Sequence, residues 1–203
     1  MTHERARDGT ATRIHLTADP ARFEPLLGGG FLLSGAAGGR LEEFLQREAM
    51  IGADYLRERV QTLFLDGRPV DDPAAAVVAD GAVVSLSAAM PGLAGAVLRR
   101  SGRYAAMRRP ISHDAGRKAD ATPSPVTVTL KLFNLIAREL GPQFLARGIR
   151  IDSEGLRDFL ERQGRWLWRE GDAAAVDGRR LAPAELARAL PAPGEVWLHV
   201  TPR

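Results

Sequence analysis

The sequence predicts an α+β protein made of two tandem copies of one small fold. Three observations lead to this prediction. The pattern Leu-x-[Glu/Asp]-Phe-Leu-x-Arg-x occurs at residues 41–48 and again at residues 156–163. An apolar run that ends in Asp-Gly-Arg follows each copy, and a second strand-like segment follows each Asp-Gly turn. Because the three matches come in the same order, they indicate an internal duplication.

The first half begins with residues 12–17, whose apolar and polar side chains alternate as in a half-buried strand. The motif at 41–48 places its two leucines and its phenylalanine on one side of a helix. Residues 63–65 predict a strand that ends at the turn Asp66-Gly67, because glycine tolerates positive φ. Residues 82–87 predict the closing strand.

The second half repeats this order. Residues 126–133 are rich in β-branched side chains and predict an opening strand. The helix motif follows at 156–163, then the run 174–176 with the turn Asp177-Gly178, then a closing strand at 195–200. Strands at both ends of each half, with a helix between them, suit a small mixed sheet that packs one face on that helix.

These elements divide the chain into four segments. Residues 1–11 are expected to be a flexible N-terminus, residues 12–91 the first domain and residues 126–203 the second. Residues 92–125 predict a basic linker with a short helix in its first part, since its second part is rich in Pro, Ser, Gly and charged residues.

The linker carries the excess of positive charge. Residues 97–118 have a net charge of +6 in a chain of +3, so the remainder is at −3. Such a segment is typical of binding to nucleic acid, to an acidic partner or to an anionic membrane surface, and equally of a solvated linker. The candidate anion-binding residues are Arg99, Arg100, Arg103, Tyr104, Arg108 and Arg109.

Two tryptophans form a second candidate surface. Trp166 and Trp168 alternate between Arg165 and Arg169, which predicts that both rings lie on one face of a strand. Packing in the core explains them, and so does an aromatic docking face, because Trp and Arg are frequent in protein interfaces.

Several classes of chemistry are not expected. The absence of cysteine excludes disulfides, thiolate zinc sites and thiol nucleophiles. No catalytic motif occurs, and no pair of histidines has metal-ligand spacing, so no catalytic residue, metal or cofactor is predicted. Residues 81–98 are broken by Pro91-Gly92, and the N-terminus is not a secretory signal, so we expect no transmembrane segment and a cytoplasmic location.

Three segments resemble the ubiquitin-like β-grasp sulfur carriers. Residues 128–141 resemble the opening strand and Phe-led turn of the molybdopterin synthase small subunit. Residues 64–70 and 80–86 resemble the paired segments before the tail of these carriers and of the thiamine sulfur carrier. The resemblance implies two tandem β-grasp domains, with 148–151 as a second strand and 153–163 as the helix, and an exposed sheet face that docks proteins.

The carriers act through a free C-terminal Gly-Gly, whereas this chain ends His199-Val-Thr-Pro-Arg203. Pro91 and Gly92 are the candidate remnant of a carrier tail, and processing there would be needed to expose a glycine. We therefore expect a non-catalytic protein-interaction or adaptor protein with an unknown protein partner. One alternative is a sulfur carrier of the molybdopterin or thiamine pathway. The other is an RNA-binding protein that uses the Arg-rich linker, because the Asp-Gly turns are similar to those of S4-like and TGS-like RNA modules.

Overall fold

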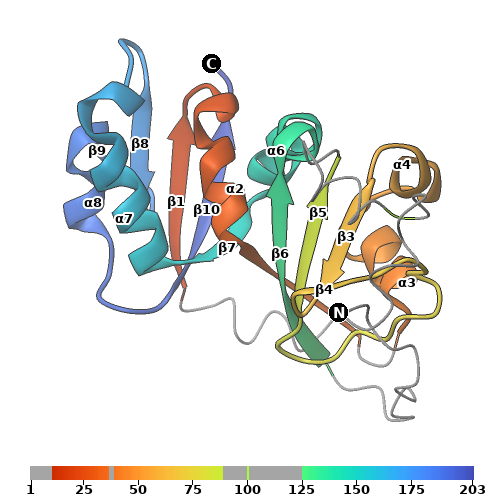
Figure 1. Ribbon diagram of the computed structural model, residues 1–203. Helices are drawn as coiled ribbons and strands as arrows, with labels where there is room; N and C mark the ends of the chain where they lie inside the picture. Colours follow the sequence, from red (N-terminus) through yellow and green to blue (C-terminus); the bar gives the residue numbers. More distant parts are fainter. Residues whose placement is uncertain (1–10, 37–38, 89–99, 101–124) are drawn as a thin grey trace. The chain divides into compact units, whose positions relative to one another are not determined.

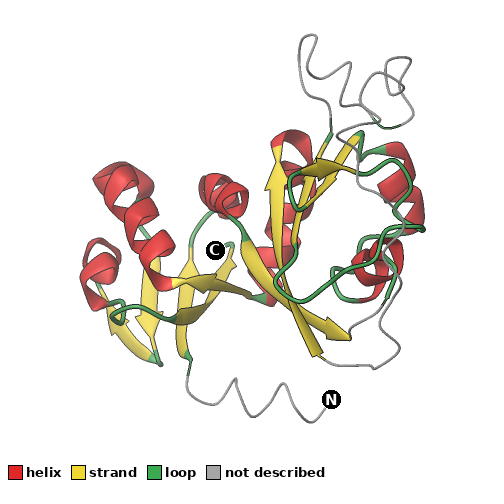
Figure 2. Cartoon of the chain, turned by 60° about the horizontal axis from the view of Figure 1, so that its bottom comes forward, coloured by secondary structure: helices red, strands yellow, loops and turns green. Residues whose placement is uncertain are grey.

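The computed structural model describes residues 11–36, 39–88, 100 and 125–203. Within these residues the chain forms ten strands and six α-helices, a mixed α/β composition compatible with the predicted α+β class (Figure 1). The chain divides into two compact units. Unit 1 consists of Met1–Phe31 and Arg138–Arg203, and unit 2 of Leu32–Ala137. Figure 2 shows the helices of each unit in red beside its strands in yellow.

Unit 2 contains a five-stranded mixed sheet with the order β4-β3-β5-β6-β2. Strand β3 pairs antiparallel with β4 and with β5, whereas β5 and β6 are parallel. Its elements are β2 (Phe31–Ala36), α3 (Leu41–Arg47), α4 (Ala53–Glu58), β3 (Thr62–Leu65), β4 (Arg68–Pro69), β5 (Val83–Ser87) and β6 (Pro125–Phe133).

Unit 1 also contains five strands, in the order β7-β10-β1-β8-β9. Strands β1 and β10 are parallel, and the remaining neighbours are antiparallel. Its elements are β1 (Thr12–Thr17), α2 (Glu24–Gly29), β7 (Ile149–Asp152), α7 (Ser153–Gln163), β8 (Ala173–Val176), β9 (Arg179–Leu181), α8 (Leu186–Ala189) and β10 (Glu195–Thr201). Helix α6 (Asn134–Arg147) begins in unit 2 and ends in unit 1.

The two halves of the sequence form the same series of elements. The series β1, α2, β2, α3, β3, β4, β5 is followed by β6, α6, β7, α7, β8, β9, β10. The halves differ in one short helix each: α4 follows α3 in the first half, and α8 precedes β10 in the second. The helix motifs fall in α3 and α7, as predicted. The two Asp-Gly turns are also alike, with φ of 51° and 75° at Asp66-Gly67 and of 48° and 80° at Asp177-Gly178.

The strands are not distributed by halves, however. Strand β6 of the second half pairs with β5 in unit 2, and β1 of the first half pairs with β10 and β8 in unit 1. Each predicted range, 12–91 and 126–203, therefore contains one strand that lies in the sheet of the other unit. The tandem β-grasp arrangement stays a prediction.

The equivalent aspartates of the two turns, Asp66 and Asp177, form hydrogen bonds with different strands. Asp66 and Val83 of β5 exchange two hydrogen bonds: the Asp66 amide donates to the Val83 carbonyl, and the Val83 amide donates to Oδ1 of Asp66, both at 2.8 Å. Asp177 makes the same pair of bonds, at 2.8 Å each, with Arg13 of β1. In unit 2 the Asp66 turn thus bonds to β5, the last strand of the same half of the sequence. In unit 1 the Asp177 turn bonds to β1, the first strand of the other half.

Helix α6 is an element that the sequence prediction missed, since this segment was interpreted as a turn. Gly141-Pro142 normally marks a turn, but both residues lie inside the helix. A Cβ at Gly141 would lie 2.7 Å from Cδ1 of Leu27, so a larger residue would require the Leu27 side chain to shift where α6 approaches α2. The packing of α6 against α2 here outweighs the local preference of Gly141-Pro142 for a turn.

The core of unit 1 forms between one face of its sheet and α7. Strand β1 contributes Ile14 and Leu16, both at most 1% exposed, and α7 contributes the buried Leu156, Phe159 and Leu160. The helix starts at a capped end, because Oδ2 of Asp152 accepts a hydrogen bond of 2.8 Å from the Gly155 amide.

A buried carboxylate joins three segments of unit 1. Asp172 is fully buried and forms a two-bond ion pair with Arg22, at 2.7 and 2.9 Å. Arg203 and the amide of Arg169 also donate to it, at 3.0 and 2.8 Å. These donors, Arg22 foremost, lower the pKa of Asp172 from 3.8 to about 2.

The strand exchange predicts that residues 126–203 do not fold alone. This fragment lacks β1, so β8 and β10 lose the strand between them together with buried Ile14 and Leu16. Circular dichroism and denaturant unfolding should show no cooperative transition, whereas the full chain unfolds cooperatively. A folded fragment would mean that β6 takes the place of β1 within its own half, as the predicted domain division implies.

The Asp172 cluster predicts loss of stability in acid. Because folding lowers the pKa of Asp172, the stabilisation is complete above pH 4 and is lost as the pH falls through about 2. Asp172→Asn should lower the free energy of unfolding at pH 7 by about 2 kcal/mol or more, since it leaves Arg22 without its anion.

Urea unfolding at a series of pH values tests this prediction. The difference between Asp172→Asn and the wild type should shrink as Asp172 becomes protonated in the wild type. Asp158→Asn, an exposed carboxylate on α7, serves as the control. A difference that stays constant down to pH 2 would contradict the prediction.

Candidate functional site

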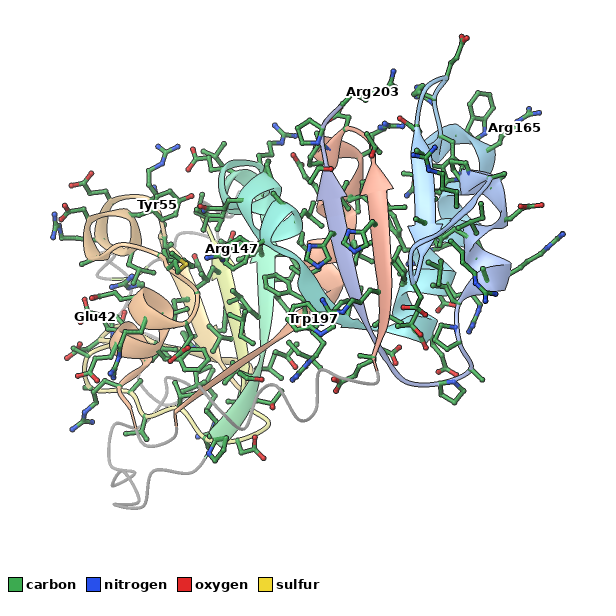
Figure 3. All side chains as sticks on the ribbon, turned by 180° about the vertical axis from the view of Figure 1, so that it is seen from behind. Glu42, Tyr55, Arg147, Arg165, Trp197 and Arg203 are labelled. Carbon is green, nitrogen blue, oxygen red and sulfur yellow. The ribbon has the colours of Figure 1, made fainter. Side chains whose placement is uncertain are left out.

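The face of the unit 1 sheet that is turned away from α7 is its candidate functional surface. Along β1 and β10 every second side chain is buried, and the alternate ones are exposed or half-buried. We call this surface the open face. It is formed by Arg13, His15, Thr17, Arg150, Trp197, His199 and Thr201. Figure 3 looks onto β10 and β1 from this side, with Trp197 labelled on β10, whereas α2 and α7 lie in front of the strands in Figure 1.

Three aromatic rings form a row on this face. Strands β1 and β10 place His15 directly beside His199. The two imidazoles stack with their centroids 4.7 Å apart and their planes within 10°. Trp197, two residues before His199 on β10, also stacks on His199, with the centroids 6.4 Å apart and the planes at 29°. The row therefore occupies β1 and β10, two neighbouring interior strands of the unit.

Gly148 makes room for this row. Its φ is +94°, and a Cβ on it would lie 2.3 Å from Cε1 of His199. Burial lowers the pKa of His199, and the nearby His15 and Arg13 lower it further, while a hydrogen bond with the backbone of Ala146 raises it. His199 is accordingly neutral at pH 7, where it offers one donor and one acceptor.

Charged groups flank the rings. Arg150 lies beside Trp197 in the register of β7 and β10, and its Nε is 3.0 Å from Oε2 of Glu195. Arg13 has an exposed side chain, and its backbone is held by Asp177. The face thus combines aromatic surface, the neutral hydrogen-bonding imidazole of His199 and the solvated arginine Arg13.

The sheet edges of the described chain are poor sites for strand addition. Strand β4 has two residues, one of them Pro69, and β9 has three, including the exposed Arg179 and Arg180. Proline, charge and short length all oppose pairing with another strand. A partner of unit 1 would therefore not add a strand at β9.

The structure does not place the predicted aromatic pair on one strand. Trp166 lies in the 3₁₀ helix Gly164–Leu167 and Trp168 directly follows it, so the predicted strand is wrong. Trp166 is 71% exposed, with the guanidinium of Arg165 4.9 Å from its ring centroid. Trp168 is half-buried and packs at an angle on Phe23. The alternation of Trp and Arg predicted a strand wrongly because a short 3₁₀ helix begins at Gly164, directly after α7.

Of the predicted anion-binding residues, the structure describes Arg100. Its guanidinium donates to the carbonyls of Leu56 and Val60, at 3.0 and 3.4 Å, and its amide donates to Gln61 at 2.7 Å. It thus binds carbonyls at the end of α4 in unit 2, and burial lowers its pKa. The other predicted residues lie outside the described part: Arg99, Arg103, Tyr104, Arg108, Arg109, Pro91 and Gly92.

Sequence reasoning missed the histidine pair. The sequence shows no pair of histidines at metal-ligand spacing, so His15 and His199 were not predicted to lie together, although each occupies a polar position of an alternating strand. Alternation alone assigns each one to the solvent side of its strand. Their proximity follows from the pairing of β1 with β10, which joins the two halves of the sequence.

Other kinds of site and known relatives were also sought. Within the described residues, no three His, Cys, Asp or Glu side chains lie together where they could hold a metal ion. None of the described helices has the length and apolar character needed to cross a membrane. Comparison with protein families, with curated proteins and with solved structures gives no match for this chain.

The histidine pair predicts a second pH dependence. Because folding lowers the pKa of His199, the folded chain binds fewer protons than the unfolded chain. Stability is therefore complete above the ordinary histidine pKa of 6.5 and falls as the pH drops through that of folded His199. His199→Gln should flatten the dependence between pH 7 and 5, as measured by urea unfolding. NMR titration of the imidazole protons gives the pKa directly, and a value at or above 6.5 would contradict the prediction.

Proposed function

We propose that this chain is a non-catalytic protein-interaction or adaptor protein, and that it docks its partner on the open face of unit 1. The observation that carries the proposal is the row of His15, His199 and Trp197 on the interior strands β1 and β10. Aromatic and arginine side chains at the centre of a surface are the residue types that most often dominate protein–protein affinity.

The charges of the face indicate the chemistry of the partner. The charge of Arg150 is balanced by Glu195, and His199 is neutral, so Arg13 is the solvated cation beside the rings. A partner with an apolar or aromatic centre and an acidic side chain opposite Arg13 would complement this surface. A neutral His199 also avoids the cost of burying an unpaired charge on docking.

The proposal extends to the family and the location of the chain. A tandem ubiquitin-like β-grasp origin is supported by the repeated element series and the paired Asp-Gly turns. In that family the exposed sheet face docks proteins, which agrees with the open face as the binding surface. We propose a cytoplasmic location on the same grounds.

Site-specific photo-crosslinking in the native host tests the docking surface. A benzophenone amino acid replaces Thr17 on the open face or, as a matched control, the exposed Glu161 on α7. The Thr17 probe should yield a discrete adduct that the Glu161 probe does not, and mass spectrometry should identify a protein in it. Adding Arg13→Glu to the Thr17 probe should remove most of the adduct.

Three outcomes would overturn the proposal. One is the same set of adducts from both probe positions, which would indicate random collisions. Another is an adduct that ribonuclease removes, which would favour RNA; its yield should then fall steeply with salt. The third is an adduct that Arg13→Glu leaves unchanged.

A further inference from the structure

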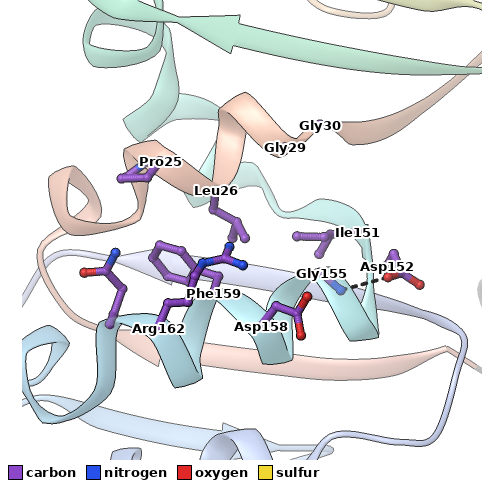
Figure 4. Close-up of a pocket in the computed structure, with 11 residues that line it drawn as sticks. Pro25, Leu26, Gly29, Gly30, Ile151, Asp152, Gly155, Asp158, Phe159 and Arg162 are labelled. Atoms are coloured by element: carbon purple, nitrogen blue, oxygen red, sulfur yellow. Dashed lines mark hydrogen bonds between the residues drawn. The ribbon is translucent and has the colours of Figure 1, made fainter.

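A pocket lies on the opposite side of unit 1, between α2 and α7 (Figure 4). Its volume is about 350 Å³, near the lower end of the range for small-ligand sites. Leu26, Ile151 and Phe159 supply its apolar surface, and all three side chains are buried. The pocket is independent of the open face, because no residue of that face lines it.

Asp158 and Arg162 line this pocket, and neither has a charged partner among the described residues. Asp158 and Arg162 are four residues apart on α7, with the acidic residue first, the spacing and order that favour an ion pair. Glu43 and Arg47 on α3 have the same arrangement and form an ion pair at 3.1 Å. Among the described residues, however, Asp158 and Arg162 form no ion pair or hydrogen bond with each other or with any other group.

Figure 4 shows how the two side chains are separated. The Arg162 side chain extends toward Leu26 and Phe159, whereas the Asp158 carboxylate points toward the first turn of α7. Residues at this helical spacing have Cβ atoms about 5–6 Å apart, so one small molecule can reach both charges.

Two glycines keep the walls of the pocket free of side chains. The neighbouring Gly30 needs to be glycine because its φ is 108°, but Gly29 and Gly155 do not have positive φ. A Cβ on Gly29 would meet no atom within 4 Å, and one on Gly155 would find ordinary contact at 3.6 Å. Glycine lowers helix stability relative to alanine, so at these positions it provides space rather than backbone freedom.

We propose that this pocket binds a small zwitterion with an apolar body, the chemistry of a free apolar α-amino acid. The Asp158 carboxylate accepts hydrogen bonds from the ligand ammonium, and the Arg162 guanidinium donates to the ligand carboxylate. The ligand side chain lies on Leu26 and Phe159, where its burial adds to affinity. The exposed charges of α7 are thereby paired through the ligand instead of with each other.

NMR titration of the full chain with L-leucine and L-phenylalanine tests the proposal. At least one should cause saturable shifts at the Gly29, Gly155 and Phe159 amides, with a Kd of about 1 mM or lower. Three matched probes each lack one feature: 3-methylbutylamine the carboxylate, 4-methylpentanoate the ammonium, and glycine the apolar side chain. Each should bind about tenfold more weakly or worse, because each loses one group of contacts.

Variants of the chain identify the groups that bind. Asp158→Asn and Arg162→Gln should each raise the Kd about tenfold, and Gly155→Leu should abolish binding by filling the space. Glu161→Gln and Arg188→Gln, exposed residues outside the pocket, serve as controls and should leave the Kd unchanged. Because Asp158 and Arg162 are exposed, their variants decide the question even if Gly155→Leu fails to fold.

The proposal fails if neither amino acid gives a saturable shift at about 10 mM, ten times the expected Kd. It also fails if 3-methylbutylamine or 4-methylpentanoate binds as tightly as the amino acid, since one of the two charges would then be irrelevant. Binding that survives Asp158→Asn and Arg162→Gln unchanged would place the ligand elsewhere.

Discussion

The parallel pairing of β1 with β10 is the constraint on which unit 1 depends. It joins the first described strand of the chain to the last and places the buried Ile14 and Leu16 opposite α7. It also aligns His15 with His199 on the other face. Because both are interior strands of the unit, the core and the open face are the two faces of the same strand pair. A substitution that loosens this strand pair should therefore alter the core and the surface together.

Local chemistry was sufficient to predict the helices α3 and α7 and the strands β1, β3, β5, β6, β8 and β10, but not the other helices of the described chain. The motif at 156–163 lies within helix α7, because its apolar spacing is encoded within a few residues. The full bounds Ser153–Gln163 are those that the β-grasp resemblance implies. The Asp-Gly turns follow from the same kind of signal. Helix α6 was missed because Gly141 and Pro142 favour a turn locally, and what offsets this preference is the close contact with Leu27, which lies far away in sequence.

The pairing of the strands and the residues of the candidate site could not be predicted from the sequence for a related reason. Alternation shows which side of a strand His15 and His199 occupy, but it contains no information on the neighbouring strand. The duplication favoured pairing within each half, whereas the Asp177 turn binds Arg13 of the first half. Charge patterns were similarly ambiguous: Arg100 belongs to a basic run that suggests anion binding, yet its guanidinium bonds to backbone carbonyls.

The two surfaces of unit 1 meet in strand β7, and this decides how they have to be tested. Arg150 lies on the open face, whereas its neighbour Ile151 lines the pocket, because successive strand residues point to opposite sides. Substitutions in β7 would therefore disturb both surfaces, and their effects could not be assigned to one. Asp158 and Arg162 project from α7, and Arg13 and Thr17 from β1, so each pair changes one surface while leaving the shared strand intact. Loss of amino-acid binding without loss of crosslinking, and the reverse, would then show that the two surfaces act independently.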